Sequence, residues 1–382
     1  MKRRLMVMRF WWLSIFGFLL SNSHLAPAQI NVQDYLLAAE YYSGTTFLHS
    51  PTMRFDIPER SWGFGSELMF QSQGKRYWHE MYGFPRIGVQ LGFKDFGNAD
   101  ILGYAIGCVP QIDFPLLRTS LSTTWLRFGF GADIITKPYD RVSNYNNNAI
   151  GTYLNNMTHF GFLWESSISP HWALRLGATL THTSNGAVIM PNLGLNTAEA
   201  RFGLVYHATP PKERVTTTYK HLPRERKIIG NFRLGLGAEQ FKTPDGPTYP
   251  VYVAEAFASY QVSRGSKLNL GLEWNYYPAN AAFNQNIDIP PDAITAQFEP
   301  SRVSLNLGHE LMFGQVSFLV SIFMYVDHPF EGGGWYGNKL GPRIYLFKPH
   351  ESGRRHNIFI GGYMKSHGTV ADYIELSAGF CF

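Results

Sequence analysis

His182 and Ser184 are the residues of this chain whose types and spacing suggest chemistry, because a histidine beside a serine can activate that serine as a nucleophile. Both continue an alternating pattern, which predicts a β-strand over residues 171–184. The apolar face of that strand carries Trp172, Leu174, Leu176, Ala178 and Leu180. His182 and Ser184 share this face, and their backbones are expected to lie about 6.5 to 7 Å apart. We therefore predict a nucleophile and its general base on a lipid-facing surface, which favours a lipid substrate.

The first residues have the features of a secretory signal peptide. A basic start (Lys2 to Arg4), an apolar run (Phe10 to Leu20) and a small-x-small motif (Ala26 to Ala28) follow one another. We predict a cleaved signal peptide over residues 1–28. Its four basic residues and no acidic one mean that cleavage lowers the formal net charge from +5 to about +1. The basic balance of the full sequence therefore indicates no nucleic-acid partner, and we expect none.

The composition of the remaining chain indicates a membrane protein that is all-β. No apolar stretch after residue 28 approaches the roughly 20 residues that a membrane-spanning helix requires. Aromatic residues make up 15% of the sequence, charged residues only 16%, and there are 37 glycines. Lipid tolerates only helices or closed sheets, so a secreted chain of short alternating segments predicts a transmembrane antiparallel β-barrel of the bacterial outer membrane. The alternating segment that ends in Phe382 is similar to the assembly signal of such barrels.

Alternating segments recur along the whole mature chain, with apolar residues on one face and glycine or charged residues on the other. An apolar outside and a polar inside are typical of transmembrane barrels. We expect about 14 to 16 strands in a single barrel domain over residues 29–382. The strands are expected near 35–46, 61–72, 84–95, 101–112, 122–136, 157–168, 171–184, 195–207, 228–241, 250–262, 266–278, 300–312, 315–327, 339–348, 356–365 and 371–382.

The expected turns and loops give the barrel a direction. Tight turns at 167–170, 263–266 and 312–315 fall on the periplasmic side, and longer loops at 137–156 and 279–299 fall outside. His182 and Ser184 are then at the depth of the outer leaflet. The basic segment 208–227 is an unusually long periplasmic connection, which we interpret as a solvated linker.

Two neighbouring motifs carry a resemblance to a known family. The segment from His182 to Gly186, followed by the segment from Pro191 to Asn196, resembles the signature of the lipid A 3-O-deacylase (PagL-type) family, which is also described as acyloxyacyl hydrolase-like. The strand from Phe128 to Ala132 and the loop from Asn148 to Asn155 are similar to that family as well. The resemblance extends over roughly residues 120–207.

The resemblance implies an outer-membrane esterase that removes an ester-linked acyl chain from lipid A in lipopolysaccharide. Ser184 matches the family's nucleophile and His182 its general base. Asn185, together with Gly186, would hold the oxyanion through its amide or a backbone N–H. The expected partners are lipid A and the lipids of the outer membrane.

The chain departs from the family pattern at Asn196, where the founding members have the glutamate that orients the histidine. Strand alternation places Asn196 outward beside His182, whereas the nearby Glu199 faces the lumen. We therefore predict a triad of Ser184, His182 and Asn196. An asparagine oxygen can accept the imidazole N–H but cannot neutralise an imidazolium, and such an exchange in a serine triad can cost about 10⁴ in rate. The chain also encodes about twice as many strands as the founding members.

Two other interpretations stay open. His182 and Ser184 could be ordinary polar residues at the headgroup level. The protein could also be a non-enzymatic pore or transport barrel with a decayed catalytic motif, because about sixteen strands can enclose an aqueous channel. No histidine pairs with an acid or cysteine at metal-ligand spacing and no phosphate-binding glycine loop occurs, so we expect neither a metal nor a cofactor. The sequence leaves open which acyl chain is cut and the oligomeric state.

Overall fold

The computed structural model describes residues 35–47, 52–56, 58–210, 228–240, 244–286, 299–329, 334–347, 356–368 and 370–382. Sixteen β-strands and two short helices lie within these residues. The strands are β1 (Tyr35–Phe47), β2 (Ser61–Gln71), β3 (Arg86–Asp95), β4 (Tyr104–Arg118), β5 (Ser122–Ile135), β6 (Leu154–Ser167), β7 (Trp172–Ser184), β8 (Leu195–His207), β9 (Ile228–Gln240), β10 (Thr248–Ser263), β11 (Ser266–Tyr276), β12 (Ser301–Phe313), β13 (Val316–Tyr325), β14 (Tyr336–Tyr345), β15 (Asn357–His367) and β16 (Val370–Cys381). The helices are α2 (Tyr77–Met81) and α3 (Pro278–Asn286).

The all-β, antiparallel class and the sixteen strands agree with the sequence prediction. The strand expected over 195–207 coincides with β8, and the other strands overlap their expected ranges. Among the described helices, none has the length and apolar character needed to cross a membrane. The predicted signal peptide, and residues 211–227 of the basic linker, lie outside the described residues.

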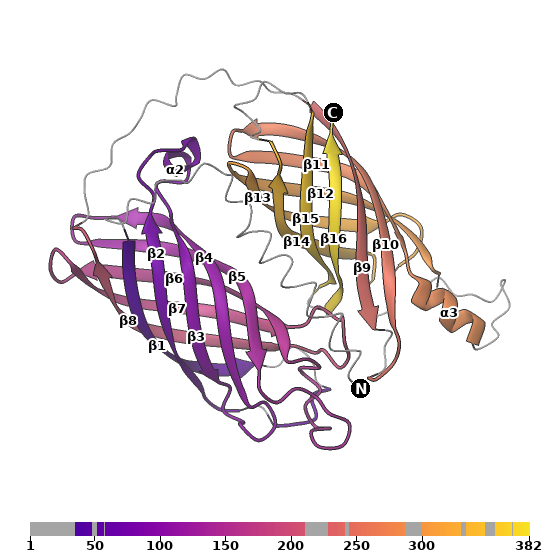
Figure 1. Ribbon diagram of the computed structural model, residues 1–382, viewed down its shortest axis with the longest axis horizontal. Helices are drawn as coiled ribbons and strands as arrows, with labels where there is room; N and C mark the ends of the chain where they lie inside the picture. Colours follow the sequence, from indigo (N-terminus) through magenta and orange to yellow (C-terminus); the bar gives the residue numbers. More distant parts are fainter. Residues whose placement is uncertain are drawn as a thin grey trace.

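The prediction of one barrel is wrong, because the described strands close two (Figure 1). In the first barrel β8 returns to pair with β1, from Leu36 opposite His207 to Phe47 opposite Asn196. In the second barrel β9 pairs with both β10 and β16. A period of two specifies which side chains face the core but not which strand is the neighbour. The segment between β8 and β9 therefore joins two barrels rather than two strands of one.

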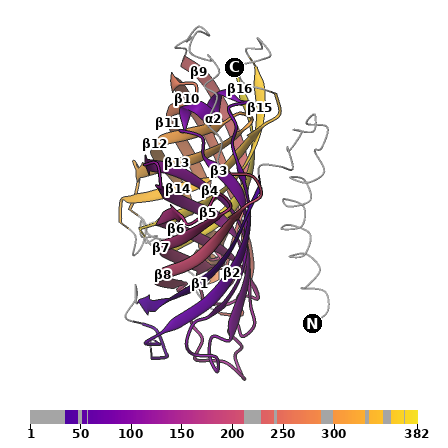
Figure 2. The same ribbon diagram turned by 90° about the vertical axis from the view of Figure 1, so that its left-hand side faces the viewer.

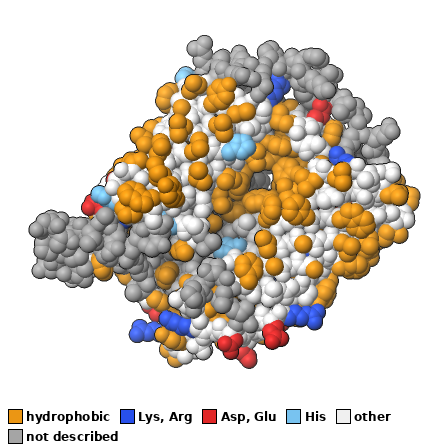
Figure 3. All heavy atoms as spheres, turned by 180° about the vertical axis from the view of Figure 1, so that it is seen from behind, with side chains coloured by type: hydrophobic (Ala, Val, Ile, Leu, Met, Phe, Trp, Pro, Cys, Tyr) orange, Lys and Arg blue, Asp and Glu red, His pale blue; other side chains and the backbone are white. Residues whose placement is uncertain are grey.

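Both barrels carry apolar residues outside and polar residues inside, as predicted for a membrane-spanning sheet. On β7, Leu176 and Leu180 are 43% and 53% exposed, whereas Arg175 and Thr179 on the opposite face are buried. Figure 3 shows hydrophobic and uncharged side chains over the middle of the visible surface, with charged side chains gathered mainly toward its edges.

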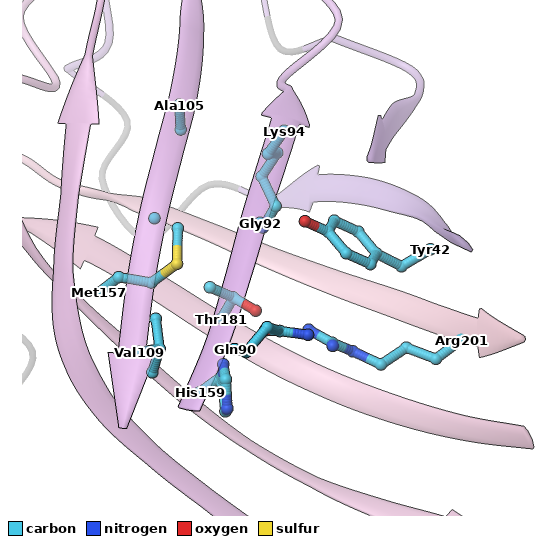
Figure 4. A pocket seen from close by; sticks show the side chains of 11 residues that line it. Tyr42, Gln90, Gly92, Lys94, Ala105, Val109, Met157, His159, Thr181 and Arg201 are labelled. Atoms are coloured by element: carbon cyan, nitrogen blue, oxygen red, sulfur yellow. The ribbon is translucent and has the colours of Figure 1, made fainter. Parts of the chain in front are cut away.

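Ion pairs and hydrogen bonds fill the interior of the first barrel. Arg127 is fully buried and pairs with Asp113 at 2.8 Å and with Glu67. Arg175 pairs with Glu40 at 2.5 Å. Figure 4 shows a cavity in this lumen, which has room for about one water molecule. An eight-stranded barrel is just wide enough for its own side chains, so the described strands do not form the wide channel that a pore of about sixteen strands would contain.

The two barrels contact each other along their outer surfaces. At the end that carries α2, the Tyr82 hydroxyl donates a hydrogen bond to the Gly265 carbonyl at 2.6 Å, and its ring packs against Phe313 at 4.9 Å. Nearer the middle, Phe128 of β5 meets Phe318 of β13 at 4.9 Å between ring centroids. Figure 2 shows the barrels overlapping when viewed from the side, with strongly tilted strands. The contact thus extends from the α2 end toward the opposite end, where β7 terminates.

Candidate active site

The candidate site lies where β7 ends and β8 begins, at the end of the first barrel opposite α2. The antiparallel register sets Asn196 of β8 directly across from His182 of β7, and Ser184 follows two residues later on the same face. Directly opposite positions in a sheet bring side chains within reach of each other. The strand pairing therefore places three polar side chains together, as the sequence pattern predicts.

The three side chains form a continuous relay. His182 Nδ1 lies 2.7 Å from Asn196 Oδ1, and His182 Nε2 lies 2.9 Å from Ser184 Oγ. The amide oxygen of Asn196 can only accept a hydrogen bond, so Nδ1 carries the proton and donates it. Nε2 is then left to accept the hydrogen of the Ser184 hydroxyl. This is the arrangement that general-base activation of a serine requires.

The two faces of the sheet differ at this position. His182 and Asn196 are partly buried on the outer face, in line with the exposed Leu180. Glu199 instead lies in the lumen, where Lys94 Nζ pairs with its Oε1 at 2.5 Å. It is therefore Asn196, and not the nearby carboxylate, that contacts the imidazole.

Asn185 holds the loop after β7 together. Its backbone N–H donates to Asn192 Oδ1 at 2.8 Å, and its Nδ2 donates to the Ile189 carbonyl at 2.7 Å. Of the donors predicted for an oxyanion, the Asn185 backbone N–H is therefore already engaged. Gly186 follows with a positive φ of 66°, and its N–H donates no hydrogen bond to another described residue.

Glycine at position 194 allows a neighbouring loop to pack directly against the histidine. Its φ is +75°, and an added Cβ would lie 2.9 Å from His182 Cε1. The Gly194 N–H donates to the Ala149 carbonyl at 2.9 Å, which joins the loop after β7 to the loop after β5. Gly194 and Asn192 lie in the motif that resembles the family signature, yet the sequence gives them no role. Their contacts depend on loops that meet only in the folded barrel.

Across the described part of the chain, no group of three or more His, Cys, Asp or Glu side chains is arranged to hold a metal ion. His182 and Ser184 are the types of side chain that acyl transfer by a serine and a base requires.

Comparison with known proteins assigns both halves of the chain to one family. Residues 62–205 match the family described as lipid A 3-O-deacylase (PagL). Residues 228–382 match the acyloxyacyl hydrolase, C-terminal domain. The chain belongs to the lipid A 3-O-deacylase family. The first match lies within the first barrel with His182, Ser184 and Asn196, and the second begins at the first residue of β9.

Membership makes the chain part of a hydrolase family that acts on lipid A, and together with the β-barrel fold it points to the bacterial outer membrane. No curated protein matches the chain. Solved structures that are similar include the outer membrane protein opdK from Pseudomonas aeruginosa, with 14% identity, coverage of 91% of this chain and 97% of that one, and a TM-score of 0.23. A BenF-like porin from Pseudomonas fluorescens Pf-5 has 8% identity, coverage of 91% and 97%, and a TM-score of 0.22.

Proposed function

We propose that the protein removes an ester-linked acyl chain from lipid A, with Ser184 as nucleophile, His182 as general base and Asn196 as the residue that orients the histidine. The observation that carries this proposal is the relay from Asn196 Oδ1 through the imidazole to Ser184 Oγ, with distances of 2.7 and 2.9 Å. Polar residues that merely lie at the headgroup level are not expected to contact the two opposite nitrogens of one imidazole, as Asn196 and Ser184 do.

In the first half of the reaction, Ser184 Oγ attacks the ester carbonyl carbon while His182 Nε2 takes the hydroxyl proton. The negative charge that develops on the carbonyl oxygen would be met by the Gly186 N–H and by the second hydrogen of Asn185 Nδ2. When the intermediate collapses, the bond to the sugar oxygen breaks and His182 returns the proton to that oxygen. The acyl group is left on Ser184.

In the second half, water takes the place of the serine. His182 Nε2 accepts a proton from the water while the water oxygen attacks the acyl carbonyl. The bond to Ser184 Oγ then breaks, His182 Nε2 gives the proton to Oγ, and the fatty acid leaves. Asn196 keeps Nδ1 protonated throughout, but as a neutral group it cannot offset the charge of the imidazolium. A slower reaction than that of a carboxylate triad follows, by up to about 10⁴.

The position of the relay supports a membrane lipid as substrate. His182 continues the outward face of β7, on which Leu176 and Leu180 are exposed. In a bilayer this face contacts acyl chains, so lipid A can approach the partly buried His182 by lateral diffusion without leaving the outer leaflet, whereas Ser184 itself is only 2% exposed.

Mass spectrometry of lipid A from cells that produce the parent protein or Ser184→Ala tests the proposal. We expect the parent to yield lipid A that lacks one acyl chain, and Ser184→Ala to leave lipid A intact. Ser43→Ala, which removes a serine hydroxyl from the outer side of β1 in the same barrel, is the matched control and should behave as the parent. Equal acylation for parent and Ser184→Ala, with both folded in the outer membrane, would refute the proposal.

A further inference from the structure

The loop that follows Ser184 adopts an uncommon backbone conformation. Gly186 and Ala187 both have positive φ angles, of 66° and 62°. Glycine takes such angles without cost, but for alanine they are strained and persist only where the surrounding structure holds the chain. Something must therefore hold Ala187 next to the candidate nucleophile.

The second barrel makes the contacts that hold it. Gln240, the last residue of β9, donates its backbone N–H to the Ala187 carbonyl at 3.2 Å. Its side-chain Oε1 accepts the Met190 N–H at 2.6 Å, and its Nε2 donates to the Gly246 carbonyl at 2.5 Å. Gln240 is 8% exposed. One buried side chain thus connects a hairpin of the second barrel to the loop of the candidate site.

A second strand of the same barrel also packs against the loop that follows Ser184. Ile374 lies on β16, which pairs with β9. A Cβ added to Gly186 would lie 2.5 Å from both Cδ1 and Cγ1 of Ile374. The isoleucine therefore packs directly against the backbone of the residue whose N–H is a candidate oxyanion donor.

We propose that Gln240 is a positioning residue for catalysis, and that the second barrel serves the reaction by fixing Gly186 and Ala187 against Ser184. This inference rests on the proposed function, because it deepens the account of the same site. A correctly placed Gly186 N–H stabilises charge that exists only in the transition state. Loss of its alignment should then lower kcat while KM changes little.

Gln240→Met tests the proposal in the full-length protein, because methionine keeps the volume of the side chain but replaces the strong amide acceptor of the Met190 N–H by a weak thioether and loses the donor to the Gly246 carbonyl. The matched control is Tyr82→Phe, which removes a hydrogen bond between the same two barrels at the end away from the site. In detergent micelles with purified lipid A, we expect Gln240→Met to lower kcat about 10- to 100-fold with KM within twofold. Tyr82→Phe should leave both constants within twofold of the parent.

Hydrogen exchange of the segment 185–190 gives a second readout that does not need activity. Amides of this segment should exchange faster in Gln240→Met than in the parent or in Tyr82→Phe. An unchanged kcat together with unchanged exchange would overturn the proposal, as would an equal loss of kcat in Tyr82→Phe. Ser184→Ala in the same assay separates the two claims. If it stays active the proposed function fails, and the exchange data still decide whether Gln240 holds the loop.

Discussion

At the scale of single residues, Asn196 is the proposed third member of the triad, in place of the glutamate that the family resemblance implies. Strand alternation alone predicts that Asn196 lies beside His182, and the register of β7 and β8 places their side chains 2.7 Å apart. The amide oxygen can do half of what a carboxylate does, because it fixes the tautomer and ring orientation of the histidine. It cannot stabilise the positive charge that the imidazole would gain in the proposed reaction.

Substitutions at Asn196 should therefore separate these two contributions. Asn196→Ala is expected to lower turnover by about 10- to 10³-fold, as the loss of a positioning hydrogen bond to a general base can do. Asn196→Glu should raise turnover or shift its pH optimum, because a carboxylate would stabilise the imidazolium. The measurement is the pH–rate profile of lipid A deacylation for the three proteins. Parent-like rates in both variants would assign the third role to another group.

The sequence predicts the relay but not what surrounds it, for a physical reason. His182, Ser184 and Asn196 follow from the period of two, which is a local property of a strand. Gln240 and Ile374 belong to the other barrel, and no local pattern indicates that they reach the loop after Ser184. Their contribution arises only from the packing of one closed sheet against another.

At the scale of elements, the strands are well predicted, whereas the two short helices α2 and α3 are missed. The five residues of α2 offer little more than one turn, and no side chain caps its N-terminus. Tertiary contacts explain α2 better than its sequence does. Trp78 is buried, packs edge-on against Phe313 of β12 at 5.9 Å, and thereby joins the helix to the second barrel.

His79 should make this contact sensitive to acid. Burial, together with the positive charges of Arg76 and Lys75, lowers the pKa of His79 from 6.5 to about 4. The unfolded chain therefore takes up this proton more readily, so the stability that the neutral histidine contributes is complete above pH 6.5 and is lost as the pH falls toward 4.

The expected outcome is a pH-dependent difference between the parent and His79→Gln. Between pH 7 and pH 4.5 the urea midpoint of unfolding should fall further for the parent, because glutamine does not titrate. Interior carboxylates titrate equally in both proteins and cancel in the comparison. Parallel declines of the two midpoints would show that His79 stays unprotonated or contributes nothing.

At the scale of the whole molecule, two barrels of eight strands replace the predicted single barrel of about 14 to 16 strands. Each described interior contains its own charge network. In the second barrel Arg233 pairs with Glu255 at 2.5 Å and with Glu375, while Lys339 pairs with Glu273 at 2.5 Å. Lumen-facing charges suit a water-filled pore and a packed ionic core equally well. Their presence in the sequence could not decide between the two, whereas strand closure does.

Conductance measurements should agree with the packed interiors. We expect the purified protein to produce no steady open channel in a planar lipid bilayer, because an eight-stranded barrel is filled by its own side chains and the cavity described in the first lumen has room for about one water molecule. A porin of sixteen strands in the same bilayer serves as the positive control. A stable conductance that survives Ser184→Ala would instead support the transport interpretation.

Each sheet closes on its own first strand, and this closure has a consequence for the order in which the two barrels can fold. β1 and β8 complete one seam, and β9 and β16 complete the other. Neither seam needs a strand from the other half, so the earlier-synthesised half can acquire all its sheet hydrogen bonds first. His182, Ser184 and Asn196 would then already be aligned in a newly formed barrel, while Gln240 reaches Met190 only after docking. Maturation of the site would accordingly occur in two stages, with the chemical groups assembled before the loop beside them is secured.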